Sequence, residues 1–245
     1  MVDSTDSKIV QIMDSSSGRL INKLTHGCEI SCVFLNQHSL GPQERLLAFV
    51  DRNRDLFIAA IYGGSASGAA VTGPSVAIPT YKLHAHVESF VFNDDTNVLV
   101  GLADGRLTFW YHPDVAFVDR DLLPSTSVST DATEFGRGAQ ILSYTSNRIS
   151  LRKIDGSILF AASKPDVPLL YELTRANKWD EATRLCRFQK DTCLWATLAS
   201  MALAKKQLES AEIALAELNE VTEMEVYNKY NFLRTEKKYV LLSIS

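Results

Sequence analysis

Short runs of apolar and β-branched residues recur through residues 1–165 with turn residues between them, and this recurrence constrains the fold more than any other sequence feature. The clearest unit is a hairpin in which residues 97–103 and 106–112 flank Asp104-Gly105, a dipeptide that favours a tight two-residue turn. Alternation of apolar and polar residues within such runs is typical of half-buried strands. Comparable runs surround three further turns, at residues 15–18, 52–55 and 146–147.

The spacing of these strands indicates how they are grouped. The predicted innermost strands begin near residues 28, 86 and 132, so the units repeat every ~45 to 60 residues with four strands each, which is the period of propeller blades with long loops. We therefore predict a partial WD40-type β-propeller of about three and a half blades over residues 1–165. An antiparallel sandwich is the alternative, because it contains similar strands without a fixed four-strand rhythm.

The predicted number of blades has a consequence for the chain. Closed propellers contain roughly four to eight blades, so the sequence is expected to be the end of a longer protein or a shortened form of it. An unpaired edge at its first strands is expected to promote self-association.

The period of the apolar residues changes at Pro168. Apolar residues then recur every three or four positions, which predicts amphipathic helices joined by short polar links. The predicted helices cover residues 168–178, 179–188, 192–206 and 208–218. We predict two domains, the propeller blades over 1–165 and an α-helical solenoid segment over 166–245, so the fold class is β plus α.

The helical part contains an internal echo. Trp179-x-x-Ala182 recurs as Leu208-x-x-Ala211, and a large residue followed by a small one lets a facing helix approach closely. This resembles the helix pairs of tetratricopeptide-type (TPR-like) solenoids, although the period is shorter than 34 residues.

The dipeptide Trp179-Asp180 is the one that names the WD repeat, yet its surroundings predict a helix start. Asp180 and Glu181 fall in the first predicted turn, where acidic side chains interact favourably with the helix dipole. Asn177 is a plausible N-cap. We therefore interpret the pair as the beginning of the helical part and not as a strand end in a blade.

Charge and hydropathy exclude two classes of partner. Lys and Arg number 25 against 29 Asp and Glu, so the chain lacks the basic surplus that phosphate neutralisation requires, and we do not expect nucleic acid as a partner. The longest apolar run, residues 56–62, is far shorter than the ~20 residues that cross a bilayer. Neither membrane insertion nor a secretory signal is expected, and four cysteines without a disulfide pattern indicate a reducing compartment.

No catalytic constellation is visible, so we expect no enzymatic activity, no cofactor and no metal. The spacing of His84 and His86 could put both imidazoles on one side of a strand as metal ligands, but no further ligand follows at a suitable spacing. Cys28 and Cys32 are expected to pack in the core. The glycine-rich residues 63–75 lack the Gly-Lys-Ser/Thr of a phosphate loop and are interpreted as a connecting loop.

The most distinctive segment is 107–124, in which aromatic and charged residues gather after a predicted strand. One interpretation is a long loop whose aromatic residues pack on the blade. The other is a partner-docking patch, because aromatic residues and Arg dominate interface hot spots. The candidate docking residues are Trp110, Tyr111, Phe117, Asp119, Arg120 and Asp121.

Five motifs carry a resemblance to a known family. They are "DRNRDLF" (51–57), "ADGRLTFW" (103–110), "FWYHPDVAFVDRDLLP" (109–124), "KWDEATRLCRF" (178–188) and "LWATLASMALA" (194–204). In this order, over roughly residues 8 to 228, the sequence resembles the intraflagellar transport protein 80 family, the WD-repeat subunits of intraflagellar transport complex B. The last residues, 228–245, depart from the family pattern.

The resemblance implies two tandem propellers followed by a helical solenoid, of which this chain covers the later blades of the second propeller and the start of the solenoid. It also implies a non-enzymatic scaffold that supports cilium and flagellum assembly, with other complex B subunits as partners. The implied location is the cilium or flagellum and the basal body, with a cytoplasmic pool. A propeller-solenoid adaptor of the vesicle-coat type is the alternative, because architecture alone does not fix function.

Overall fold

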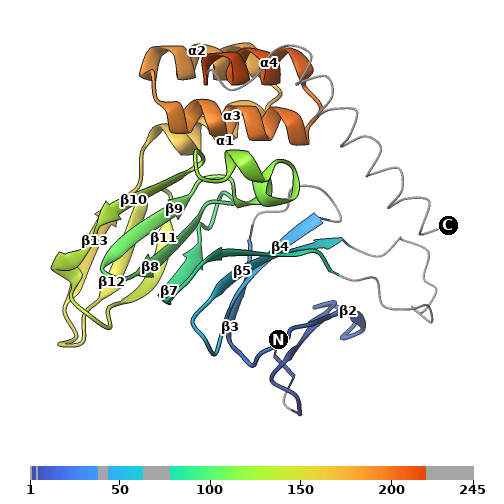
Figure 1. The fold of residues 1–245 in the computed structure, drawn as a ribbon, viewed down its shortest axis with the longest axis vertical. Coiled ribbons are helices and arrows are strands. Elements are labelled where there is room, and N and C mark those ends of the chain that lie inside the picture. The colour runs from blue at the N-terminus through green and yellow to red at the C-terminus, as the bar shows by residue number, and fades with distance from the viewer. Residues whose placement is uncertain (1, 4, 38–43, 63–77, 219–245) are drawn as a thin grey trace. The chain divides into compact units, whose positions relative to one another are not determined.

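A computed structural model describes residues 2–3, 5–37, 44–62 and 78–218 (Figure 1). The chain divides into two compact units. The first, called here the blade unit, contains residues up to Phe109 together with Ser129–Ser163. The second, the helical unit, contains Trp110–Val128 together with the residues from Lys164 onward. The predicted glycine-rich loop (63–75) and the divergent residues 228–245 lie outside the described residues.

The blade unit consists of antiparallel sheets in which strands that follow one another in the sequence lie side by side. A two-stranded sheet contains β1 (Ile9–Met13) and β2 (Leu20–Thr25). The first four-stranded sheet contains β3 (Ile30–Leu35), β4 (Glu44–Asp51), β5 (Leu56–Tyr62) and β6 (Thr80–His84). The second contains β7 (Val87–Phe92), β8 (Leu99–Ala103), β9 (Arg106–Trp110) and β10 (Ser127–Asp131). A three-stranded sheet contains β11 (Gln140–Thr145), β12 (Arg148–Arg152) and β13 (Ile158–Ala162).

These sheets are the predicted propeller blades, but the third blade begins later than predicted. A strand close to residue 132 was expected to be its innermost strand. Instead β10 pairs with β9 as the outermost strand of the second blade, and the third blade starts at β11 with three strands among the described residues. The sequence did not reveal the pairing of β10 because no short hairpin turn joins it to β9.

The three innermost strands share one irregularity. In β3, β7 and β11 the pairing register shifts directly after the first buried residue, at Ile30, Val87 and Ile141. Such bulges increase local twist and redirect the side chains that follow. The hydroxyl of Ser89, next to the bulge of β7, accepts a hydrogen bond from the Ile141 N–H at 3.0 Å. The repeated bulge thus contributes to the contact between neighbouring blades.

A buried asparagine after an innermost strand links each blade to the next. The Asn36 amide donates to Asn97 Oδ1 at 2.7 Å, and its carbonyl oxygen accepts from Leu46 N–H at 2.9 Å. Asn93, at the equivalent position after β7, donates to the Ser146 carbonyl at 2.8 Å. Both asparagines are almost fully buried, so these bonds are shielded from competing water.

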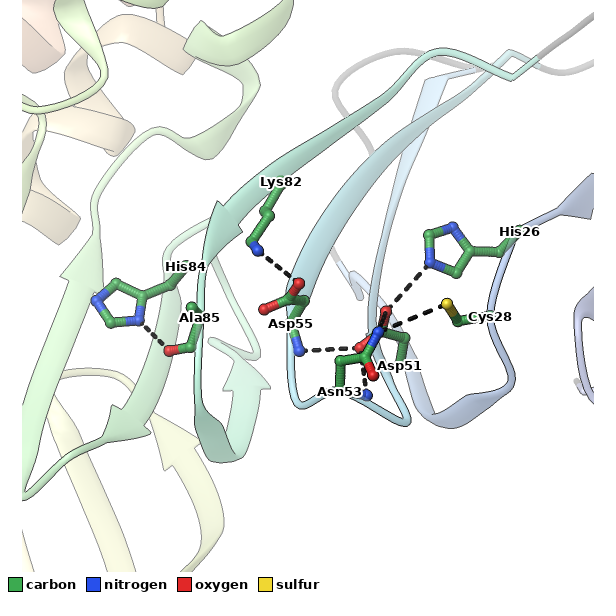
Figure 2. Close-up of polar contacts among 8 residues, drawn as sticks. All are labelled: His26, Cys28, Asp51, Asn53, Asp55, Lys82, His84 and Ala85. Carbon is green, nitrogen blue, oxygen red and sulfur yellow. Dashed lines mark hydrogen bonds and ion pairs between the residues drawn. The ribbon is translucent and has the colours of Figure 1, made fainter.

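The first four-stranded blade contains a buried carboxylate at its β4–β5 turn (Figure 2). Asp51 accepts hydrogen bonds from the backbone N–H of Asn53 at 2.9 Å and of Asp55 at 3.0 Å. Its other oxygen lies 3.4 Å from His26 Nε2, and the His26 ring packs edge-on against Phe57. Asp51 therefore connects the turn to the segment that precedes β3.

The helical unit contains four α-helices, α1 (Asp166–Arg175), α2 (Trp179–Gln189), α3 (Thr192–Ala204) and α4 (Leu208–Glu217). All four predicted helices are confirmed, and Trp179 is the first residue of α2. The apolar side of the array is well buried, since Ala182 and Ala211 are both inaccessible to solvent. Trp179 is 8% exposed whereas its counterpart Leu208 is 37% exposed, so the two halves of the echo pack to different extents.

The echo also includes the helix ends. After α1 the chain adopts a left-handed conformation at Asn177 (φ 57°), and Lys178 N–H donates to the Leu173 carbonyl at 2.9 Å. After α3 the same arrangement occurs at Lys206 (φ 61°), 29 positions later. This is the Schellman ending of a helix. The prediction that Asn177 caps α2 is wrong, because its backbone serves this ending and Lys178 takes the N-cap position.

We predict that Asp51→Ala lowers the free energy of unfolding by about 2 to 3 kcal/mol, since it leaves two turn amides without an acceptor in a buried place. Urea titration followed by circular dichroism measures the change. Asp155→Ala is the control, because Asp155 also accepts from a turn amide, Ser157 N–H at 2.8 Å, but is exposed. Equal losses in the two variants would contradict the structural role of Asp51.

Candidate interaction surface

The connection between β9 and β10, residues 111–126, is called here the strap. It is closed at its base by a hydrogen bond from Tyr111 N–H to the Thr126 carbonyl at 3.0 Å. Two short 3-10 turns form within it, Pro113–Phe117 and Arg120–Leu122. Val115 and Leu122 are fully buried, so the strap has an apolar side of its own.

The strap packs against α1 and α3 of the helical unit. The Tyr171 hydroxyl of α1 donates to the Tyr111 carbonyl at 2.6 Å. On α3, Ser200 Oγ lies 3.1 Å from His112 Nδ1 and 2.8 Å from the Thr197 carbonyl. The serine proton is needed for the Thr197 carbonyl, so the His112 Nδ1–H donates to Ser200 Oγ. The predicted blade domain, 1–165, includes the strap. In the structure the strap belongs to the same compact unit as the helices.

Burial, together with the nearby Lys205 ammonium, lowers the pKa of His112 to about 3. The imidazole is therefore neutral at physiological pH, and the tautomer that carries its proton on Nδ1 donates to Ser200. Burial also lowers the pKa of Lys205, with a further contribution from Arg175. Lys205 Nζ donates a hydrogen bond to the Thr174 carbonyl at 2.8 Å. The ammonium group thus provides a donor for a carbonyl in the last turn of α1.

The structure separates the predicted docking residues into two groups. Trp110 and Tyr111 are only 3% and 1% exposed. Phe117 and Asp119 are half-buried, while Arg120 and Asp121 are exposed. The Asp119 carboxylate accepts from Asp121 N–H at 3.2 Å and so fixes the turn that presents these side chains. Only residues 117–121 of the predicted patch are accessible to a partner.

Sequence reasoning missed His112, Tyr171 and Ser200 as the residues that position the strap. Ser200 is the one with a visible signal, because a lone hydroxyl interrupts the apolar run "LASMALA" of α3. Nothing in the sequence connects it to His112, which lies 88 positions earlier.

The histidines and cysteines of the described residues form no group of three that suits a metal ion. His84 Nδ1 lies 2.6 Å from the Ala85 carbonyl (Figure 2) and therefore donates to it.

The expectation that Cys32 packs in the core is wrong. The bulge after Ile30 shifts the alternation, so Cys32 and Phe34 are exposed whereas Ile30 is buried.

The two buried thiols, those of Cys186 and Cys193, are poor nucleophiles. Burial raises the pKa of Cys186 and of Cys193 to about 12, with the Asp191 carboxylate adding to the effect. Thiolate is the reactive form of cysteine, and a raised pKa keeps both groups protonated at neutral pH.

No helix among the described residues has the length and apolar character needed to span a bilayer.

Comparison with known proteins identifies the family. A family model described as "IFT80 second beta-propeller" matches residues 1–166. The chain belongs to the intraflagellar transport protein 80 family. A second model, "IFT80/172/WDR35/WDR19 TPR domain", matches residues 194–239. The resemblance noted from the motifs and the architecture of propeller blades followed by a TPR region are thereby confirmed.

Two curated relatives support this assignment over most of the chain. "Intraflagellar transport protein 80 homolog" of Rattus norvegicus is 36% identical over 229 residues. The protein of the same description from Mus musculus is 35% identical over 229 residues. Each match covers 92% of this chain and 28% of the relative, so the chain spans little more than a quarter of these relatives' length.

The neutral His112 makes folding sensitive to acid. The unfolded chain binds a proton near the ordinary pKa of 6.5, whereas the folded protein does so only near 3. The free energy of unfolding is therefore expected to fall by up to about 1.4 kcal/mol per pH unit as the pH drops through this window. Chemical denaturation at several pH values measures the slope.

The matched variants for this experiment are His112→Gln and His86→Gln. The first removes the buried titrating group and should flatten the pH dependence between pH 6 and pH 3.5, which are rough limits set by the two pKa values. The second replaces an exposed histidine and should retain the slope. An unchanged slope in His112→Gln would contradict the assigned role of the imidazole.

Proposed function

We propose that this chain is part of a non-enzymatic scaffold subunit of intraflagellar transport complex B, which supports assembly of cilia and flagella through protein–protein contacts. The observation that carries the proposal is the family match over residues 1–166 together with 36% identity over 92% of the chain. The relatives are described as intraflagellar transport proteins, and propeller blades and helical repeats are folds that commonly bind other proteins.

The structure supports a binding role in one specific respect. The strap is held in place by bonds from α1 and α3, so its accessible residues, Phe117 and Asp119–Asp121, are presented on a fixed backbone. A preorganised surface loses little conformational entropy on binding. We propose that these residues dock another complex B subunit.

The proposed location is the cilium or flagellum and the basal body, with a cytoplasmic pool. Self-association of the chain is also proposed, as an addition to binding of other subunits. A vesicle-coat adaptor is the competing function, and location separates the two.

The test is to express the tagged chain in ciliated cells beside the full-length family member of the same cells. Complex B subunits are expected to co-purify with both, and both should concentrate at the ciliary base. Phe117→Ser with Arg120→Glu should weaken recovery of at least one subunit by about tenfold, the effect of losing roughly 1.4 kcal/mol at an interface.

Arg184→Glu with Arg187→Glu is the matched control, because both arginines are exposed on α2 outside the strap. These substitutions should leave recovery unchanged. Absence of complex B subunits from both purifications, or location at Golgi or endosomal membranes, contradicts the transport proposal. Normal recovery with the strap variant contradicts only the docking role of residues 117–121.

A further inference from the structure

The blade unit has a concavity where the first ends of its innermost strands meet. Its volume is about 740 Å³, within the range of binding sites for small ligands and side chains. The apolar part includes Phe34, which is 40% exposed, and Phe90, whose ring lies edge-on to it with centroids 5.2 Å apart. All of its lining residues belong to the blade unit.

Three arginines line this concavity, although the whole chain carries a net charge of −4. Arg52 is paired with Glu29 at 3.1 Å. The guanidinium groups of Arg54 and Arg137 are exposed and have no ion pair or hydrogen bond with any described residue. The two groups are therefore available to an anionic ligand without loss of an existing bond.

The concavity also contains two carboxylates, those of Asp51 and Glu88. The buried Asp51 accepts from two turn amides and lies beside His26. Glu88 accepts from the Gly138 N–H at 3.2 Å. Gly138, next to Arg137, has φ 74°, in the left-handed region that favours glycine. These hydrogen bonds do not remove the charge of the carboxylates, so the lining residues contain three arginines against two carboxylates.

Arg54 occupies a place where glycine is the easier residue. Its φ of 62° lies in the left-handed region, and its carbonyl accepts from Val87 N–H at 2.8 Å. In the next blade the equivalent turn position is Gly105, with φ 71° and a carbonyl that accepts from Ala132 N–H at 2.8 Å. The same backbone task is thus performed by a glycine in one blade and, at a steric cost, by an arginine in the other.

We infer that this concavity is a docking site for an acidic peptide segment of a partner protein, with an apolar side chain against Phe34 and carboxylates near Arg54 and Arg137. The two guanidinium groups without an ion pair, Arg54 and Arg137, favour an acidic partner. The exposed aromatic ring favours a peptide over a purely anionic polymer. All residues of the site belong to the blade unit and none to the strap. The site does not depend on the proposed transport role.

The experiment uses the full chain and a fluorescent peptide in which one phenylalanine is flanked by glutamates. Binding by fluorescence anisotropy is expected, and it should weaken with added salt because the charges are exposed. Arg54→Gly and Arg137→Gln should each weaken binding several-fold, and together by about tenfold or more, as loss of roughly 1.4 kcal/mol implies. Arg19→Gln, an exposed arginine outside the concavity, should bind as the unaltered chain does.

Arg54→Gly also separates binding from folding. Glycine relieves the left-handed strain, so the midpoint of thermal unfolding should not fall. Cys32 lines the concavity and is exposed, whereas Cys28 is not among its lining residues. Bound peptide should therefore slow alkylation of Cys32 and leave that of Cys28 unchanged.

Any one of several results would overturn the inference. They are absence of peptide binding, equal binding by the doubly substituted chain, and equal protection of Cys28 and Cys32. Equal affinity for a peptide with glutamines in place of the glutamates would also overturn it, and tighter binding of an oligonucleotide than of the peptide would identify an anionic polymer as the preferred ligand instead. None of these results bears on recovery of complex B subunits.

Discussion

A blade of three or four strands cannot cover its own two faces, so every sheet of the blade unit depends on its neighbours for burial. Neighbouring blades are joined by apolar packing and by hydrogen bonds that recur from blade to blade. A buried asparagine follows both β3 and β7, and each reaches the next blade. A bulge near the start of each innermost strand recurs three times. Because these bonds are buried, loss of one partner leaves an unsatisfied group in the interior.

The second blade differs from the first in the connection between its last two strands. This connection, the strap, belongs to the helical unit. Instead of a hairpin, sixteen residues, 111–126, separate β9 from β10. They carry their own buried apolar residues and accept a hydrogen bond from Tyr171. His112 is kept neutral by burial and donates to Ser200. A segment that begins and ends in a sheet thus completes the core of the helices.

Much of the architecture could be predicted from the sequence because it rests on local signals. The period of the apolar residues located all four helices, and turn residues located most hairpins. The pairing of β10 could not be predicted, since it depends on contacts across the strap and not on a turn. The exposure of Cys32 was also hidden, because a single bulge reverses the alternation that follows Ile30. The candidate surface was found only in part, since burial of Trp110 and Tyr111 depends on tertiary packing.

The strap folds with the helices and not with the strands that flank it. Native-state hydrogen exchange tests this directly in the unaltered chain and in Tyr171→Phe, with Tyr144→Phe as the control in the blade unit. We expect the strap amides to exchange with those of α1 and α3, and Tyr171→Phe to lower their common opening free energy by about 1 kcal/mol. Strap amides that exchange together with β9 and β10, unaffected by Tyr171→Phe, would contradict the account.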